Sequence, residues 1–278
     1  MEKVLSAVVK AVNDAKETSP LSGSWTNFTT INLVANAQLA VGGRAATCFL
    51  PDEAKPIAAI SKSIYINAGT LKQIARESLT EAAKAAVELG KPWVLDPVAA
   101  GLGATRNALL KDLKPYKPTI IRGNASEVIT LANFWELQTA KKGNVEGVDA
   151  TDTVYEALES AKELAKWTGG TVTVSGKTDL VLNNKEIYAV SGGSDMLKKI
   201  TGGGCSLGGV IAVYAAVAEP LIAALTGSVV YKWASETAAN STKGSFSFQT
   251  AFIDNLSLLD AETIRTYAET SIRKMVKA

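Results

Sequence analysis

The chain has 278 residues, of which 47% are hydrophobic and 20% are charged, so it can bury a sizeable core in one large α/β domain or two smaller ones. Its net charge of +2, without a long basic run, gives no case for nucleic acid or membrane partners. Histidine is absent, which excludes every mechanism that needs an imidazole base or a histidine metal ligand.

The first predicted element is an amphipathic helix near the N-terminus, with Leu5, Val8, Val9 and Val12 on one side. It lacks the apolar core of a signal peptide, and two cysteines suit a reducing compartment, so we expect a cytoplasmic protein. The longest uncharged apolar run, residues 207–218, is shorter than the ~20 residues of a membrane span. It predicts a helix in the protein's own core.

Short β-rich runs alternate with longer helical runs, which is typical of a mainly parallel sheet with helices on both faces. The expected strands of this sheet are 63–67, 92–96, 119–122 and 171–175. Helices are expected over 71–89, before the second of these strands, and over 154–167, before the fourth.

After this sheet, two short β-rich runs at 180–182 and 187–190 flank a polar turn and predict a hairpin. The last third is expected to be helical, with Pro220 as the first residue of a helix to about Ala239. Residues 139–147 are expected to form a mobile surface loop. No repeat or linker divides the chain, which favours a single domain.

Polar residues and glycines follow each of the four central strands. They are Asn67 with Gly69, Asp96 with Pro97, Arg122 with Asn124, and Ser175 with Gly176. Ligands of open parallel sheets bind beyond the carboxyl ends of the strands, so we expect these residues to line one crevice. The alternative is that they are ordinary turn residues, which the same residue types also favour.

A glycine run, Thr201-Gly202-Gly203-Gly204-Cys205, opens the apolar helix. Such a start directs unpaired backbone N–H groups at one spot, where the helix dipole also favours negative charge. Cys205 would lie on the first turn, where we expect a lowered thiol pKa. The alternative is a tight turn with a small buried cysteine.

Residues 200–205, ITGGGC, resemble the anion-hole motif of the hydroxyethylthiazole kinases of thiamine salvage, a ribokinase-like branch with cysteine in place of the usual catalytic aspartate. The similarity continues, in order, through Ser19–Leu21, Thr26–Asn27, Asn32, Ala35–Asn36, Asn67–Leu71, Leu95–Val98, Ile121–Glu127, Gly147–Asp149 and Gly244–Phe246. The resemblance implies one ribokinase-like α/β/α domain over residues 1–278, with a mainly parallel central sheet. The implied reaction is ATP-dependent phosphorylation of the hydroxyl of 4-methyl-5-(2-hydroxyethyl)thiazole.

The resemblance also implies roles for the residues on the ATP side. The amides of Gly202, Gly203, Gly204 and Cys205 would hold the transferring phosphoryl group, with the thiol beside the acceptor hydroxyl. By resemblance, Arg122 matches the ATP-binding arginine of the family. A guanidinium suits this role because it can bind a phosphate with two N–H groups. Ser175 stands where the family has a threonine that contacts ATP, and Asn124 completes the expected cofactor-binding set.

Asp96 and Glu127 are carboxylates at neighbouring strand ends, and they would repel one another unless a cation or a proton lies between them. The family is magnesium-dependent, and Mg²⁺ bridged through water to the ATP phosphates would relieve this repulsion. The alternative for either residue is a helix N-cap or a loop hydrogen bond.

The acceptor side departs from the family pattern. The resemblance places Asn27, Gly69 and Gly202 around the thiazole, and Thr47 where the family carries a substrate-contacting methionine. Gly23 and Ser194 stand where the family has histidines, and Trp25 could refill part of that space. These changes leave reaction class better supported than substrate identity.

Several alternatives therefore remain open at the level of sequence. They are a kinase for a related heterocyclic alcohol, a nucleotide-dependent dehydratase of the same superfamily, and a non-catalytic ligand-binding protein. The resemblance implies a homotrimer with acceptor sites between subunits, and a small-molecule alcohol as partner.

Overall fold

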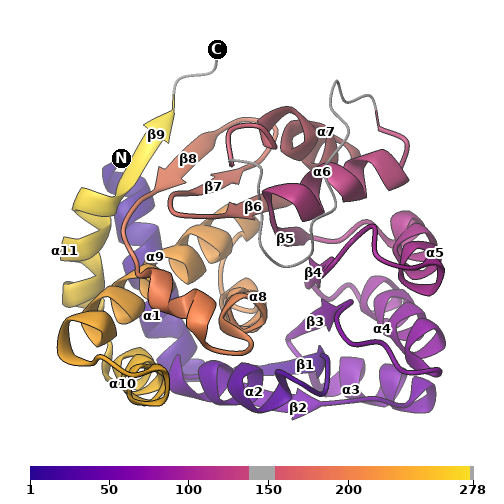
Figure 1. Cartoon of the computed structure of the whole chain (residues 1–278), viewed down its shortest axis with the longest axis horizontal. Helices are drawn as coiled ribbons and strands as arrows, with labels where there is room; N and C mark the ends of the chain where they lie inside the picture. Colours follow the sequence, from indigo (N-terminus) through magenta and orange to yellow (C-terminus); the bar gives the residue numbers. More distant parts are fainter. Residues whose placement is uncertain (138–153, 276–278) are drawn as a thin grey trace.

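A computed structural model describes residues 1–137 and 154–275, which form one sheet with helices on both faces (Figure 1). The nine strands lie in the order β2-β1-β3-β4-β5-β6-β7-β8-β9. The first six strands in this order, β1 to β6, are parallel. β7, β8 and β9 extend the sheet with antiparallel pairs. The strands are β1 (Leu21–Trp25), β2 (Arg44–Thr47), β3 (Ser63–Asn67), β4 (Trp93–Asp96), β5 (Ile120–Asn124), β6 (Thr171–Ser175), β7 (Asp179–Leu182), β8 (Ile187–Val190) and β9 (Ile272–Met275).

The helices form two layers. One face carries α1 (Glu2–Thr18), α2 (Ile31–Ala40), α8 (Gly203–Ala215), α9 (Pro220–Ser241), α10 (Ser245–Leu258) and α11 (Ala261–Ser271). The other carries α3 (Ala54–Ile60), α4 (Ala75–Glu88), α5 (Ala104–Leu113), α6 (Ala125–Phe134) and α7 (Leu158–Thr168). The sheet curves around α8 and α9, which occupy its concave side in Figure 1.

The central strands are buried along nearly their whole length because both of their faces are covered. In β3, Tyr65 packs into the core on the α8 side, whereas Ile64 and Ile66 pack into the core beneath α4. β4 repeats this alternation, with Val94 and Leu95 in opposite cores. Because these strands are parallel, their carboxyl ends lie at the same edge of the sheet.

The expected three-layer α/β/α fold is confirmed, and several elements match their predicted bounds. β3 and β6 have the predicted limits, β7 and β8 form the predicted hairpin, and α9 begins at Pro220. The helices expected over 71–89 and 154–167 begin later, at Ala75 and Leu158. The stretch 139–147 and the motif Gly147–Asp149 lie outside the described residues.

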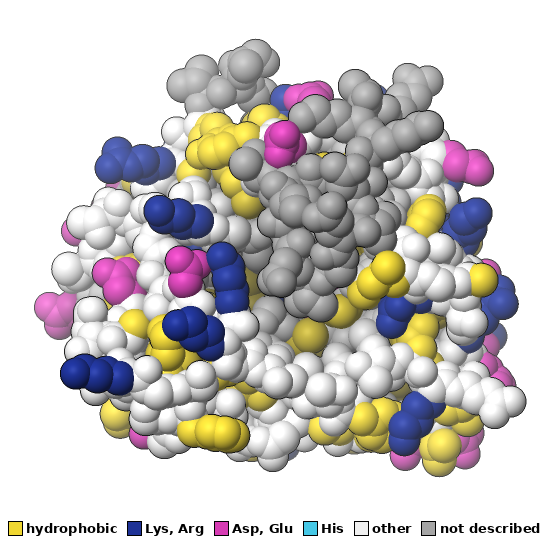
Figure 2. Space-filling view, in the orientation of Figure 1, with side chains coloured by type: hydrophobic (Ala, Val, Ile, Leu, Met, Phe, Trp, Pro, Cys, Tyr) yellow, Lys and Arg dark blue, Asp and Glu magenta, His cyan; other side chains and the backbone are white. Residues whose placement is uncertain are grey.

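α8 is buried on all sides from Ser206 to Ala215, as expected of a core helix. Within the described ranges no helix is long and apolar enough to cross a membrane. Figure 2 shows basic and acidic side chains scattered among apolar ones on the described part of one face.

Candidate active site

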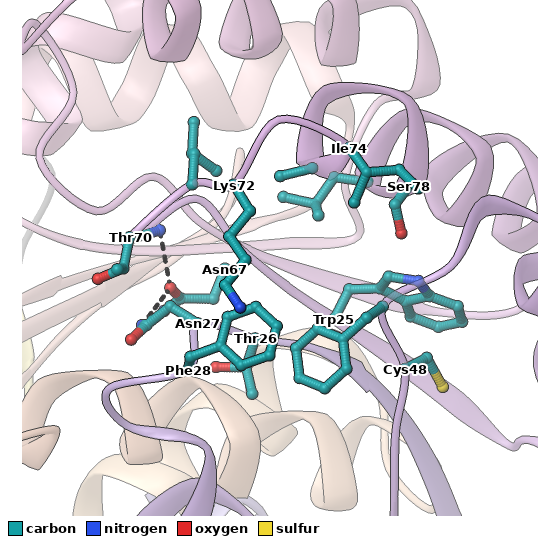
Figure 3. Close-up of a pocket in the computed structure, with 15 residues that line it drawn as sticks. Trp25, Thr26, Asn27, Phe28, Cys48, Asn67, Thr70, Lys72, Ile74 and Ser78 are labelled. Atoms are coloured by element: carbon teal, nitrogen blue, oxygen red, sulfur yellow. Dashed lines mark hydrogen bonds between the residues drawn. The ribbon is translucent and has the colours of Figure 1, made fainter.

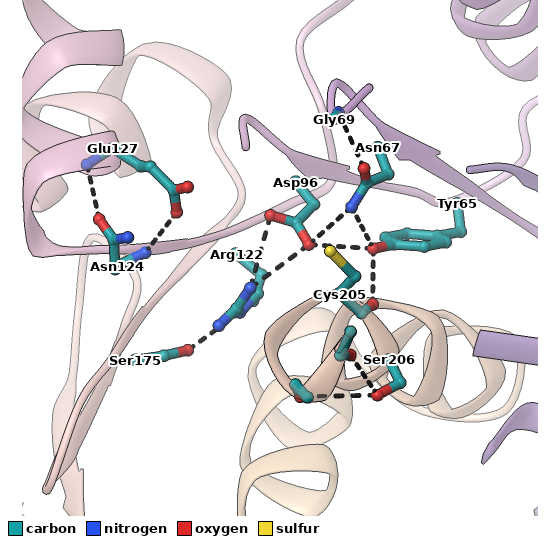
Figure 4. Close-up of polar contacts among 12 residues, drawn as sticks. Tyr65, Asn67, Gly69, Asp96, Arg122, Asn124, Glu127, Ser175, Cys205 and Ser206 are labelled. Carbon is teal, nitrogen blue, oxygen red and sulfur yellow. Dashed lines mark hydrogen bonds and ion pairs between the residues drawn. The ribbon is translucent and has the colours of Figure 1, made fainter. Parts of the chain in front are cut away.

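Four side chains from neighbouring strands meet at the carboxyl edge of the sheet (Figure 4). Asn67 of β3 donates to Asp96 Oδ2 of β4 at 3.1 Å, and Arg122 Nη1 of β5 lies 3.3 Å from the same oxygen. Arg122 Nε donates to Ser175 Oγ of β6 at 3.0 Å. The structure thus brings together the strand-end residues that the sequence pattern predicts to share one crevice.

The Arg122 guanidinium lies against the start of α8. A Cβ atom placed on Gly204 would be 3.1 Å from Nη2 and 3.2 Å from Nη1, so glycine permits this close approach. Burial alone would lower the pKa of Arg122, which is 7% exposed, but the charges of Asp96 and Glu127 raise it. The guanidinium therefore stays positively charged at the helix N-terminus.

The glycine run turns sharply into α8. Gly202 is the N-cap with φ of +90°, a left-handed conformation that favours glycine. Gly203 N–H donates to the Ile200 carbonyl at 3.4 Å, so this amide of the expected cradle is already engaged. Within the described residues, the amides of Gly204 and Cys205 have no recorded acceptor, as is usual on the first turn of a helix.

Cys205 lies on the first turn of α8, as predicted, and faces Asp96 and Asn67 in Figure 4. Its Sγ is 3.8 Å from Asn27 Nδ2. Burial, followed by the charge of Asp96, raises the pKa of this thiol to about 11. The expectation of a lowered pKa is therefore wrong, because desolvation outweighs the helix terminus and the charge of Arg122.

The predicted acceptor residues Asn27 and Gly69 lie beside this thiol. Asn67 Oδ1 accepts from Asn27 Nδ2 at 3.0 Å and from the Gly69 amide at 2.9 Å. A Cβ on Gly69 would meet Asn27 Nδ2 at 2.8 Å, so the glycine allows the two asparagines to pair. Gly202 lies next to Thr30, with only 2.9 Å between its ideal Cβ position and Thr30 Cβ.

A cavity of about 40 Å³ extends from these amides into an apolar region (Figure 3). Trp25, expected to fill space on the acceptor side, lines this cavity. The Phe28 ring stacks on Phe49 at 4.1 Å between centroids, and Lys72 Nζ lies 3.6 Å from the Phe28 centroid. The cavity thus offers amide groups at one end and aromatic surface at the other.

The two carboxylates occupy different local settings. Glu127 forms a capping box with Asn124, in which the Asn124 side chain accepts from Glu127 N and Glu127 Oε2 accepts from Asn124 N. Its Oε1 accepts from the Ala99 amide at 3.0 Å. The helix-cap alternative is thus realised at Glu127, and Asn124 uses its side chain oxygen in the same cap.

Burial raises the pKa of both Asp96 and Glu127, and the charge of Asp96 raises that of Glu127 further. Arg122 opposes both shifts, and Arg106 also interacts with the charge of Glu127. A cation near this pair would relieve the remaining repulsion, so the donor set fits a hard metal ion. Among the described residues no three His, Cys, Asp or Glu side chains form a metal cluster.

Residues 12–262 match the model of the hydroxyethylthiazole kinase family. The chain belongs to this family. It is 48% identical to hydroxyethylthiazole kinase of Bifidobacterium longum subsp. infantis, over 92% of this chain and 88% of that relative.

Solved structures agree with the family assignment. A hydroxyethylthiazole kinase protein from Pyrococcus horikoshii OT3 superposes with a TM-score of 0.84 at 28% identity, covering 97% of this chain and 99% of that chain. A ribokinase-like superfamily protein from Enterococcus faecalis V583 shares the fold, with a TM-score of 0.58 at 12% identity over 91% of this chain and 89% of that chain. The expected ribokinase-like architecture is confirmed.

The three residues that are expected to depart from the family pattern lie in different places. Thr47 ends the edge strand β2, is exposed, and is not among the residues that line the cavity. Gly23 packs against α3, since a Cβ there would be 3.0 Å from Ile57 Cγ2, so a larger side chain would require this contact to move. Ser194 accepts from Met196 N and caps a short 3₁₀ helix, Asp195–Lys199.

Tyr65, a fully buried side chain of β3 at the centre of this candidate site, was not predicted from the sequence. Its hydroxyl lies 2.9 Å from Asp96 Oδ2 and 2.6 Å from the Cys205 carbonyl oxygen. A tyrosine within an apolar strand gives no local signal of such a role. Only the packing of α8 on β3 reveals it.

Proposed function

We propose that this kinase transfers the γ-phosphoryl group of ATP to the hydroxyl of 4-methyl-5-(2-hydroxyethyl)thiazole, a step of thiamine salvage. The observation that carries the site assignment is the contact of the Arg122 guanidinium with Gly204 at the start of α8. A guanidinium and a helix N-terminus at one point both favour an anion. Cys205 and the two asparagines lie next to this point, on the acceptor side.

The chain's own residues account for the steps of phosphoryl transfer. The amides of Gly204 and Cys205 donate to the migrating phosphoryl group, and Arg122 neutralises charge on the ATP phosphates. Ser175 fixes the guanidinium through its hydrogen bond to Nε. The alcohol oxygen bonds to phosphorus as the bond to the leaving ADP oxygen breaks, and the hydroxyl loses its proton late in this loose process, to an oxygen of the transferred phosphoryl group.

Cys205 acts in this scheme as a neutral positioning group. With a pKa of about 11 the thiol is protonated at neutral pH. It lies beside the acceptor hydroxyl and, with the Asn27 amide, orients that oxygen toward the phosphoryl group. Alignment, rather than proton abstraction by sulfur, is its contribution.

Asp96 and Glu127 are the residues that would hold Mg²⁺, through intervening water. Their shared burial and mutual repulsion support this assignment. When bound, the ion supplies positive charge that stabilises the phosphates of ATP during transfer.

A neighbouring subunit completes the acceptor site in this proposal, within a homotrimer. The cavity of about 40 Å³ is smaller than the roughly 300 Å³ lower bound for typical ligand pockets, and it shares Leu71 and Lys72 with a more open cavity of about 360 Å³ in the same chain. Thr47 is exposed on an edge strand and is not among the residues that line the cavity of its own chain, so in this proposal it contacts the site of an adjacent copy.

The decisive experiment measures ADP release by the purified, folded protein with ATP, Mg²⁺ and the thiazole alcohol. We expect turnover that depends on both the alcohol and Mg²⁺. Faster turnover with a pyridine or pyrimidine alcohol would reassign the acceptor. Thermal stabilisation by ligand without ADP formation would instead indicate a binding protein and contradict the proposal.

A further inference from the structure

Lys232 of α9 places a buried ammonium group in a cage of four oxygens. The residue is 6% exposed, and its Nζ lies 3.1 Å from Asp179 Oδ1. It also donates to the carbonyl oxygens of Gly176 and Lys177, each at 3.1 Å, and of Gly192 at 3.4 Å. The lysine ammonium group has three N–H donors for four converging oxygens, so the arrangement resembles the coordination shell of a monovalent cation.

This cage joins two loops that lead to the nucleotide side of the site. Gly176 and Lys177 directly follow Ser175, whose hydroxyl accepts from Arg122 Nε. Asp179 Oδ1 accepts from the Gly176 amide at 2.9 Å, so the same carboxylate shapes the β6–β7 turn. Gly192 follows β8, at the beginning of the segment that leads to the glycine run of α8.

Other residues of α9 reinforce the same two regions. The Tyr231 hydroxyl donates to the Gly203 carbonyl at 2.7 Å and also contacts Ser206. Glu236 Oε2 accepts from the Gly193 amide at 3.2 Å. One face of α9 thus holds the start of α8 and the loop after β8, with the Lys232 ammonium between the loops.

We infer that Lys232 is a positioning residue for ATP. Its ammonium group takes the place of a bound monovalent cation. Without a cation, three carbonyl dipoles and the Asp179 carboxylate would face one another in a buried space. The β6–β7 turn would then shift, and Ser175 would no longer fix the Arg122 guanidinium. This inference rests on the proposed kinase function through its nucleotide site.

The variant Lys232→Ala empties the cage and allows chemical rescue. We expect the KM for ATP to rise roughly tenfold with a smaller change in kcat, because the altered residue acts through Ser175 and Arg122. Ammonium or potassium chloride at roughly 100 mM restores a low KM, since these ions match a carbonyl cage of this kind. Lithium and tetramethylammonium, which are too small and too large, do not.

Matched variants separate this role from general damage. Lys166→Ala removes an exposed lysine and leaves both the KM for ATP and the salt response unchanged. Lys232→Arg keeps the charge with a wider head group and gives a smaller increase in KM than alanine. If Lys232→Ala does not fold, the double variant Lys232→Met with Asp179→Asn removes both charges. We expect this variant to have a raised KM for ATP that does not change when potassium is added.

A wild-type KM for ATP in Lys232→Ala would overturn the inference, as would a raised KM that no monovalent cation lowers. A wild-type KM in the double variant would overturn it as well. Calorimetric binding of a non-hydrolysable ATP analogue tests the same cation dependence without turnover. If the wild-type protein binds the analogue but phosphorylates no thiazole alcohol, only the acceptor assignment fails.

Discussion

Two opposing effects act on the sulfur of Cys205. The N-terminus of α8 and the Arg122 guanidinium favour a thiolate, whereas burial and the Asp96 carboxylate disfavour it. The second pair prevails, and the pKa rises to about 11. A cysteine on the first turn of a helix is therefore not by itself an activated nucleophile, because the depth of the site decides its ionisation.

Cys205 should consequently react slowly with alkylating agents. A pKa of about 11 rather than the ordinary thiol value of 9.0 reduces the thiolate fraction at pH 8 roughly 100-fold, and the alkylation rate falls with it. Mass spectrometry of iodoacetamide-treated protein measures this rate. Cys48, with its pKa raised to about 12 by burial, should also react slowly, and denaturant should accelerate both. Rapid modification of the folded protein at pH 7 would contradict the prediction.

Arg122→Lys tests whether the planar guanidinium matters beyond its charge. Lysine keeps a cation near Asp96, but it cannot bind Ser175 and a phosphate with a fork of N–H groups. We expect kcat/KM for ATP to fall roughly 100-fold, on the scale of lost charge-assisted hydrogen bonds. Steady-state ADP release measures the loss, and the same change at exposed Arg273 serves as control. Unchanged kinetics in Arg122→Lys would remove Arg122 from the nucleotide site.

Asp96 and Glu127 predict a pH-dependent response to Mg²⁺. Their raised pKa values mean that these carboxyls hold protons in the folded state that the unfolded chain has released, so stability falls as pH rises from about 4 through the folded-state values. A metal ion competes with those protons. The increase in Tm on adding Mg²⁺ with ATP should therefore be larger at pH 8 than at pH 5.

Glu127→Gln is the variant for this prediction, because the amide removes the charge and keeps one oxygen, which can accept from the Asn124 or the Ala99 amide, whereas the carboxylate accepts from both. The difference between the Mg²⁺ responses at the two pH values should shrink in this variant. If Mg²⁺ with ATP raises the Tm of the wild-type protein equally at pH 5 and pH 8, Asp96 and Glu127 do not hold the Mg²⁺ ion.

At the scale of elements, two glycines of α8 should respond differently to alanine. In Gly204→Ala the new Cβ lies 3.1 Å from the Arg122 guanidinium and displaces it, so we expect weaker ATP binding with little loss of stability. In Gly208→Ala it lies 2.5 Å from the Tyr65 ring, which is fully buried. Overpacking there should cost about 1–3 kcal/mol of unfolding free energy. Thermal unfolding and ATP titration of both variants check this contrast, which equal effects would contradict.

The elements that the sequence predicted are those whose pattern is local. β3 and β6 are runs of β-branched and aromatic residues bounded by turn residues, and α9 begins at a proline. β1 escaped prediction because Ser22, Gly23 and Ser24 give it little β-propensity, although tertiary packing buries all three.

The same distinction applies to the candidate site. Strand-end residues such as Asp96 and Arg122 could be predicted to meet, because parallel strands present their carboxyl ends together. The contacts of Lys232 could not be predicted, since its partners lie 40 to 56 positions away along the chain, in two different loops. The raised pKa of Cys205 also depends on burial, which only the packing of α8 determines.

At the scale of the whole molecule, one edge of the sheet suits contact with another copy. β2 is an edge strand, and several apolar side chains near it are exposed: Leu39 of α2, Leu50 after the strand and Ile60 of α3. An unpaired strand edge with apolar surface is a common site of association. A threefold ring would pair this surface with a different surface of the next copy and close on itself.

Subunit complementation tests whether the active site spans two copies. Cys205→Ala should be nearly inactive through loss of its positioning contact, and Thr47→Arg through steric and charge conflict in a neighbouring site. If Thr47 of one subunit meets Cys205 of the next, mixed trimers regain some intact sites, about a quarter when subunits exchange randomly in equal amounts. Recovery of kinase activity after unfolding and refolding the mixture together, with light scattering to confirm a trimer, supports this arrangement. Each variant refolded alone is the control. A stable monomer, or no recovery in a mixed trimer of two inactive variants, would mean that each chain forms its acceptor site unaided.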